Sequence, residues 1–291
     1  MRIAPLSRDD SKFAYPLLKD ALPFDAISVV ANEKLFGSNG KRAGTALGAW
    51  DGQTLVGVLA TAGRWIKLIA VAPSHRRRGI GSSLVNAAQK SAGTSQLRVC
   101  DHPGNYLSPG IDARYTDAQK FLESCRFKVI GEVFNLRAQL VNNPRITDGK
   151  KAELVEKAAS KGYVVRRAER AEELPLGGWI EHTFAPVWAH EMLLALAGPR
   201  QAVHLAFKDD VPVAFACADG NNQGLGWFGP AGTSEEHRGA GLGEALLISC
   251  LLDVRDTPEG GVIAWVGPRE FYRKVCGAVE DRKFLVFEES R

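Results

Sequence analysis

The chain has 291 residues, a net charge of +4, 45% hydrophobic residues and 24% charged residues. This composition is ordinary for a folded protein, and the length exceeds one comfortable core, so we expect two globular domains. The charge is modest and partly gathered in Arg76–Arg78, which argues against a nucleic-acid surface. The N-terminus has no apolar leader and the apolar runs are too short to cross a bilayer, so we expect a cytoplasmic protein without a membrane partner.

The first half of the sequence begins with a strand pattern and two helix patterns, followed by three strands. The Asp51-Gly52 pair between two of these strands is a hairpin signal. We predict strands at residues 2–6, 44–50, 54–62, 65–71, 96–100 and 127–140, and helices at 12–21, 27–36, 82–89 and 117–125.

The second half repeats this order after a turn-rich stretch at residues 141–149. We predict an N-terminal domain at 1–141, a linker with a linker helix at 142–162, and a C-terminal domain at 163–291. The later strands are expected at 163–167, 202–207, 211–218, 225–228, 262–266 and 283–287, and the helices at 178–184, 187–197, 244–252 and 270–275.

One pattern, Arg-x-x-Gly-x-Gly, occurs twice at an offset of 162 positions, at residues 76–81 and 238–243. Each copy follows a predicted strand and opens a predicted helix. Glycines allow a close backbone approach, and the first N–H groups of a helix attract an anion, so such a loop binds phosphate well. A glycine turn that only packs a helix on a sheet is the alternative, and the matching contexts of the two copies argue against it.

This arrangement of strand, glycine loop, helix, strand and short helix with an aromatic residue resembles the GNAT acyltransferase superfamily. The chain resembles a tandem GNAT protein over nearly its whole length. The resemblance implies an α/β (α+β) fold of two tandem GNAT-type domains. Each would contain a mixed, mostly antiparallel sheet that splays apart, flanked by helices, with acetyl-CoA bound in the gap.

The resemblance also implies which residues bind acetyl-CoA. The backbone of each glycine loop would bind the pyrophosphate, and the strand before it would pair with the pantetheine. The implied residues are Ile69, Val71, Arg76, Arg77, Arg78, Gly79 and Gly81 in the first half, and Ala231, Thr233, Arg238, Gly239, Gly241 and Gly243 in the second.

A tyrosine in the last helix often protonates the departing thiolate in this family. That position falls on Tyr272 in the second half and on Leu122 in the first, and a leucine donates no proton. Tyr106 and Tyr115, in the loop before the first-half helix, are possible substitutes. The resemblance therefore implies catalysis in the C-terminal domain with Tyr272 as general acid, although Pro268 departs from the alanine usual in this helix.

We therefore expect an N-acetyltransferase, acting as a monomer or homodimer, that transfers acetyl from acetyl-CoA to a small primary amine by direct attack and without a metal. The alternative is a non-catalytic tandem GNAT module that binds acyl-CoA or a partner. Neither glycine loop ends in the Gly-Lys-Ser/Thr of a P-loop, and both follow several strands, unlike a Rossmann loop. His204, in a strand, is expected to be structural.

Overall fold

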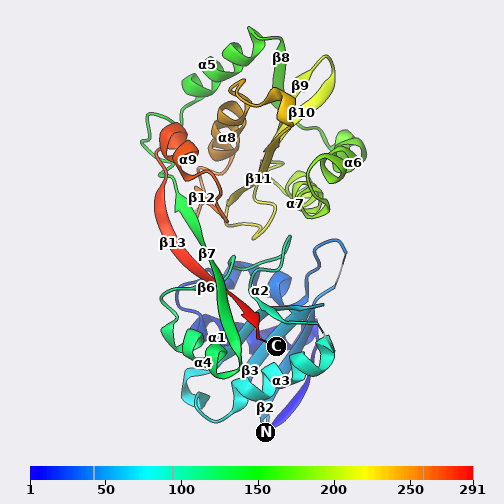
Figure 1. The fold of residues 1–291 in the computed structure, drawn as a ribbon, viewed down its shortest axis with the longest axis vertical. Coiled ribbons are helices and arrows are strands. Elements are labelled where there is room, and N and C mark those ends of the chain that lie inside the picture. The colour runs from blue at the N-terminus through cyan, green and yellow to red at the C-terminus, as the bar shows by residue number, and fades with distance from the viewer. Residues whose placement is uncertain (42, 94, 258, 291) are drawn as a thin grey trace. The chain divides into compact units, whose positions relative to one another are not determined.

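The computed structural model describes residues 1–41, 43–93, 95–257 and 259–290 (Figure 1). The chain divides into two compact units. The first contains Met1–Val133 and Arg282–Arg291, and the second contains Phe134–Asp281. The boundary therefore lies before residue 141, and the end of the predicted C-terminal domain belongs to the first unit. The reason is that two long strands each begin in one unit and end in the other.

Residues 142–162, predicted as a linker, lie in the second unit. The helix α5 (Asp148–Ala159) is capped by Thr147, whose Oγ1 accepts a hydrogen bond from the Lys150 N–H at 3.0 Å. Leu154 and Ala158, four residues apart and so on one helix face, are buried in the core of this unit. An apolar stripe of this kind is stable only when it is covered. The helix is therefore part of the second unit's core and not a linker between domains.

Among the residues described, the first unit contains four helices, six whole strands and most of β7 and of the last strand of the chain. In chain order they are β1 (Arg2–Leu6), α1 (Ser11–Ala21), α2 (Ile27–Phe36), β2 (Thr45–Asp51), β3 (Thr54–Ala62), β4 (Trp65–Val71), α3 (Ile80–Ala92), β5 (Arg98–Val99), β6 (Ile111–Asp112), α4 (Thr116–Ser124) and β7 (Phe127–Arg137), whose end lies in the second unit.

Strands β1 to β4 form an antiparallel sheet, and β4 then pairs in parallel with β5. This parallel pairing joins only Trp65 to Arg98 and Ile66 to Val99. A β-bulge lies at the next residue, Lys67, where the register with β3 shifts. Because a bulge bends its strand, the remainder of β4 diverges from β5, as the predicted splay requires.

The last strand, β13 (Val279–Glu289), is drawn in red in Figure 1. Its final residues pair antiparallel with β5, through Phe287 and Val99, and with β6. Phe287 is fully buried in the core that α3 and β3 form in the first unit. The chain's end therefore completes the sheet of the first unit.

The second unit repeats the order of the first. Its elements are the end of β7, α5, β8 (Tyr163–Arg167), α6 (Glu173–Thr183), α7 (Pro186–Ala197), β9 (Val203–Lys208), β10 (Val211–Ala218), β11 (Phe228–Thr233), α8 (Leu242–Asp253), β12 (Val262–Ile263), α9 (Arg269–Cys276) and the start of β13.

Strands β8 to β11 are antiparallel, and β11 pairs in parallel with β12 only at Phe228 and Ile263. The end of β7 pairs with β12. A register shift in β11 falls opposite residues 216–218, so this strand also diverges. The strand predicted at 225–228 is instead β11, because pairing with β10 outweighs the low strand propensity of its two glycines and proline.

No helix within the described ranges has the length and apolarity needed to cross a membrane.

Candidate active site

The two glycine loops have closely similar backbone conformations. A short 3-10 turn precedes each loop, at Pro73–His75 and at Glu235–His237. Helix α3 begins after Gly79, with φ 76°, and α8 begins after Gly241, with φ 90°. Both values lie in the left-handed region that glycine enters at little cost. The first N–H groups of each helix thus follow a glycine at the position where an anion would bind.

Two positions before these glycines, the loops carry different residues in the same conformation. Arg77 has φ 62°, and its counterpart Gly239 has φ 78°. A left-handed arginine is strained, whereas a glycine is not. The first loop therefore keeps a cation at this position at a conformational cost, and Arg77 lines a pocket.

The first arginine of each motif is held against the strand before it. Arg76 Nε donates to the Val71 carbonyl at 3.3 Å, and Arg238 Nε donates to the Thr233 carbonyl at 3.4 Å. Arg76 also donates to the carbonyl of Ala21, at the end of α1, at 3.4 Å. Both arginines thus tie the loop to the diverging strand and leave the backbone N–H groups to meet a ligand.

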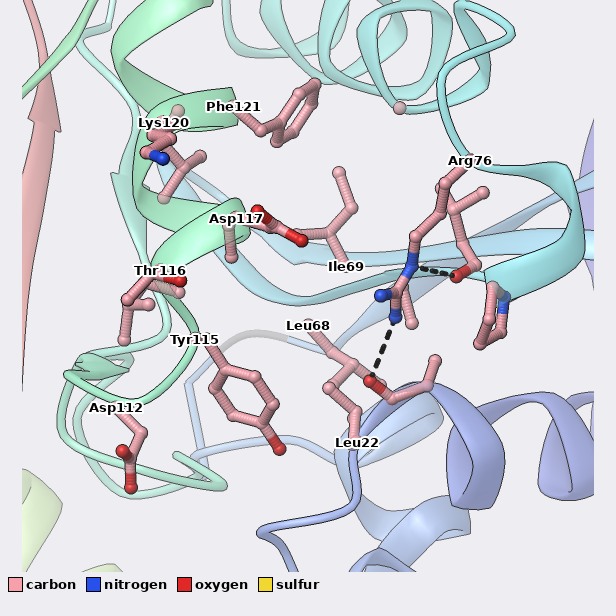
Figure 2. A pocket seen from close by; sticks show the side chains of 18 of the residues that line it. Leu22, Leu68, Ile69, Arg76, Asp112, Tyr115, Thr116, Asp117, Lys120 and Phe121 are labelled. Atoms are coloured by element: carbon pink, nitrogen blue, oxygen red, sulfur yellow. Dashed lines mark hydrogen bonds between the residues drawn. The ribbon is translucent and has the colours of Figure 1, made fainter.

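A pocket of about 870 Å³ lies in the first unit, where β4 diverges (Figure 2). Its walls come from the end of β4, the glycine loop, the segment after α1 and the start of α4. Six of the seven residues predicted to bind acetyl-CoA in this half line the pocket: Ile69, Val71, Arg76, Arg77, Gly79 and Gly81. The seventh, Arg78, does not line it. The structure therefore brings the first predicted set together around one cavity.

Tyr115, immediately before α4, is directed into this pocket toward Leu22 and Leu68 (Figure 2). Its hydroxyl donates to Asp25 Oδ2 at 2.7 Å and accepts a hydrogen bond from the Phe24 N–H at 3.1 Å. Burial and the nearby Asp25 carboxylate raise the pKa of Tyr115. Leu122, at the position usual for the family's tyrosine, is buried in the core.

An ion-pair network lies behind Tyr115. Arg282 donates to Asp25 Oδ1 at 2.8 Å and to Asp112 Oδ2 at 2.6 Å. Arg114 also pairs with Asp112, at 2.7 Å. No motif in the sequence marks these residues, and Arg282 is far from the others along the chain, so they were not predicted.

In the second unit, Tyr272 lies on α9 beside the start of β11. Its ring packs edge-on against Phe228, with centroids 6.1 Å apart, and against Phe271. An added Cβ on Gly243 would lie 3.5 Å from the Phe271 ring, so α9 is close to the first turn of α8. Burial raises the pKa of Tyr272 to about 12, and the phenol therefore stays protonated at neutral pH.

The second predicted strand positions lie on β11. Ala231 pairs with Ala216 of β10, and Thr233 pairs with Ala214. The ring of Phe184, which ends α6, covers the intervening Gly232, where an added Cβ would lie 2.6 Å from it. Phe184 stacks on Trp188 at 5.8 Å, so an aromatic cluster occupies this face.

His204 is a satisfied structural residue, as the sequence predicts. Its Nε2 lies 2.8 Å from Asp253 Oδ2, and Arg167 pairs with the same carboxylate. Burial lowers the pKa of His204.

Comparisons with known proteins agree with this geometry. Residues 27–129 match the family described as acetyltransferase (GNAT) domain. A comparison with curated proteins found no match.

Among solved structures, the chain is similar to the glucosamine N-acetyltransferase region of a fungal multi-domain β-N-acetylglucosaminidase. The TM-score is 0.77 with 18% identity over 99% of this chain, which spans 38% of that protein. It is also similar to a tandem GNAT protein of clavulanic acid biosynthesis, with TM-score 0.69, 18% identity and coverage of 99% and 97% of the two chains. An acetyltransferase from Colwellia psychrerythraea gives TM-score 0.63 and 12% identity, with complete coverage of both chains. The protein therefore carries a GNAT acetyltransferase domain over residues 27–129, and its full length has the fold of a tandem GNAT protein.

Proposed function

We propose that this protein transfers an acetyl group from acetyl-CoA to a small primary amine, by direct attack of the amine on the thioester. The observation that carries the proposal is the pocket of the first unit, where the diverging β4 meets the glycine loop at the start of α3. The pyrophosphate would accept hydrogen bonds from the loop N–H groups, and the pantetheine would lie along residues 69–71.

The two units differ in what supports a role for each. The second unit keeps Tyr272 near its glycine loop, and the sequence prediction of catalysis there, with the thioester carbonyl held near residues 231–233, remains a prediction. The lined pocket favours acetyl-CoA binding in the first unit, where Leu122 replaces the tyrosine. A non-catalytic binding role for the first unit is the second candidate, and Leu122 is the residue that favours it.

Calorimetric titration with acetyl-CoA tests binding and its location. We expect Arg76→Glu to weaken binding at least about tenfold, because it places a carboxylate beside the phosphate loop, with Arg238→Glu having the smaller effect. Lys128→Glu, an exposed change on β7, is the control for charge, and circular dichroism checks folding. Loss with Arg238→Glu alone would move the site to the second unit. Failure of the wild type to bind acetyl-CoA would contradict the proposal.

Release of free thiol with a panel of amines tests the reaction. Glucosamine and spermidine are the first acceptors to try, glucosamine because the fungal region of similar fold is described as a glucosamine N-acetyltransferase. If Tyr272 is the general acid, Tyr272→Phe lowers the turnover number about a hundredfold with little change in acetyl-CoA affinity. An unchanged turnover number would remove Tyr272 from the mechanism.

A further inference from the structure

Asp25, Tyr115 and Arg282 come from three distant parts of the chain and meet beside the first-unit pocket. Asp25 and Tyr115 line the pocket, and Arg282 is bonded to Asp25. Asp25 lies between α1 and α2, Tyr115 precedes α4, and Arg282 belongs to the last strand. The side chains of Asp25 and Arg282 are only 5% and 13% exposed. Because charged groups of this kind are stable inside a protein only when they are paired, the arrangement of the three is fixed.

The hydrogen bonds of Tyr115 set the direction in which its hydroxyl can act. The hydroxyl donates a hydrogen bond to Asp25 Oδ2 at 2.7 Å, because a carboxylate can only accept. One lone pair of the oxygen receives the Phe24 N–H at 3.1 Å. A hydroxyl oxygen has two lone pairs, so one remains. In this arrangement Tyr115 can accept one more hydrogen bond and has no proton to give to a ligand.

The acidity of Tyr115 agrees with this assignment. Burial and the Asp25 carboxylate both raise its pKa, which makes it a weak proton donor to a departing thiolate. The tyrosine ring points toward Leu68 on β4, the strand along which the thioester is expected (Figure 2). A group that accepts a hydrogen bond at this point suits the N–H of an attacking amine.

Arg282 fixes the other end of this chain of hydrogen bonds. It donates to Asp25 Oδ1 at 2.8 Å, which leaves Oδ2 for Tyr115, and its second contact, to Asp112 at 2.6 Å, holds the guanidinium in place. Arg114 neutralises Asp112 from the other side. One guanidinium therefore sets which oxygen of Asp25 faces the pocket.

We propose that Tyr115 binds the amino group of the acceptor through its hydroxyl oxygen, and that Arg282, acting through Asp25, is the positioning residue that keeps this oxygen an acceptor. The proposal rests on the proposed function with acetyl transfer in the first unit, which makes it an alternative to catalysis at Tyr272. It specifies the acceptor as a primary amine that donates an N–H to Tyr115.

The variant Asp25→Asn tests the polarity directly. Arg282 would hold the amide oxygen and turn the amide nitrogen toward Tyr115, so the hydroxyl proton would turn into the pocket. We expect Asp25→Asn and Tyr115→Phe each to raise KM for the amine about tenfold, the loss of one hydrogen bond, with KM for acetyl-CoA changed less than twofold. Arg282→Gln should also raise KM for the amine, and Arg282→Lys, which keeps the positive charge, should raise it less. Lys283→Gln, at a partly exposed neighbour that pairs with Glu132, is the control.

A spectroscopic arm decides the question without turnover. The protein is labelled with ¹³C at the Cζ atom of its tyrosines, and the Tyr115 NMR signal is assigned with Tyr115→Phe. The labelled protein is then titrated with glucosamine and spermidine in the presence of CoA. We expect the Tyr115 signal to shift with an amine and not with N-acetylglucosamine, which lacks the amino group, and the shift to be lost in Asp25→Asn.

The outcomes separate this inference from the proposed function. No shift with either amine, or an unchanged KM for the amine in Tyr115→Phe, overturns the role of Tyr115. Failure to bind acetyl-CoA in calorimetry contradicts the proposed function, while the amine titration still reports on Tyr115. If Arg282→Gln does not fold, Arg282→Lys and Asp25→Asn give the answer.

Discussion

Lys67 is a buried cation in the bulge of β4. Its side chain is among the largest fully buried ones, and Nζ donates to the Gly37 carbonyl at 2.9 Å. Burial, and then the nearby Lys34 cation, lowers the pKa of Lys67 from 10.5 to about 8. Between pH 8 and pH 10.5, Lys67 is therefore protonated in the unfolded chain but not in the folded one. Its contribution to the free energy of unfolding rises with pH across that window.

Replacing this lysine should stabilise the first unit at neutral pH. The depressed pKa corresponds to a cost of about 3 kcal/mol, and the lost hydrogen bond to Gly37 offsets about 1 kcal/mol. We expect Lys67→Met to raise the free energy of unfolding by about 2 kcal/mol at pH 7, with a smaller gain at pH 9.5. Urea unfolding at both pH values measures the difference, and Lys128→Met, on an exposed part of β7, should show none. A gain that does not shrink with pH would assign the effect to packing instead.

Single residues differ in how far the sequence reveals them. Gly79 and Gly241 are recognisable because a repeated motif marks them, and both adopt the left-handed conformation that the motif requires. Asp25 and Arg282 belong to no motif, and what joins them is the path of the last strand. Residues joined only by tertiary pairing have no local sequence signal, so the contact between Asp25 and Arg282 beside the pocket required the structure.

At the scale of elements, the repeat predicted most of the fold. The strands at residues 54–62 and 65–71 and the helix at 27–36 have the predicted bounds, because each is an apolar run ended by a clear turn. The predicted position of β11 was wrong because its glycines and proline weaken the strand pattern in the sequence. Pairing with β10 nevertheless makes this segment a strand. β6, only two residues long, lies in a loop with no periodicity to indicate it.

The two loops differ in how closely the last glycine of the Arg-x-x-Gly-x-Gly motif is packed. An added Cβ would lie 2.9 Å from the Phe121 ring at Gly81, but 3.5 Å from the Phe271 ring at Gly243. The first distance requires Phe121, which lines the pocket, to move, whereas the second is an ordinary contact. The first helix is therefore packed more closely against the element that follows it.

Matched alanine substitutions at the two positions should therefore have different effects. Alanine favours a helix over glycine by about 1 kcal/mol, so Gly243→Ala should stabilise by up to that amount. Gly81→Ala should give no gain in thermal stability and should weaken acetyl-CoA binding, because Phe121 must shift in the pocket. Thermal unfolding and calorimetry measure both effects. Equal gains in stability with unchanged binding would mean that Phe121 yields freely.

At the scale of the whole molecule, the two units are joined by exchange of strand ends. Sequence order predicts that residues 163–291 form one domain, since the second half repeats the first. The repeat pattern carries no information about which sheet a terminal strand joins, because an alternating strand satisfies either sheet equally. The apolar residues Phe284 and Phe287 are fully buried in the first unit, and this burial decides the pairing.

The exchange predicts that damage near the chain's end destabilises the first unit. Phe287→Ala removes a buried ring from the core containing Leu84 and Val99, at a cost of about 3–5 kcal/mol. Native-state hydrogen exchange should then accelerate in α3 and β3, although the mutation lies some two hundred residues further along the chain. Leu251→Ala, in the core of the second unit, is the matched control and should accelerate exchange in α8 and β10. Faster exchange in β9 and β10 after Phe287→Ala, with α3 unchanged, would place the end of β13 in the second unit and separate Arg282 from Asp25. The same experiment thus tests the strand exchange and the contact on which the positioning of Asp25 depends.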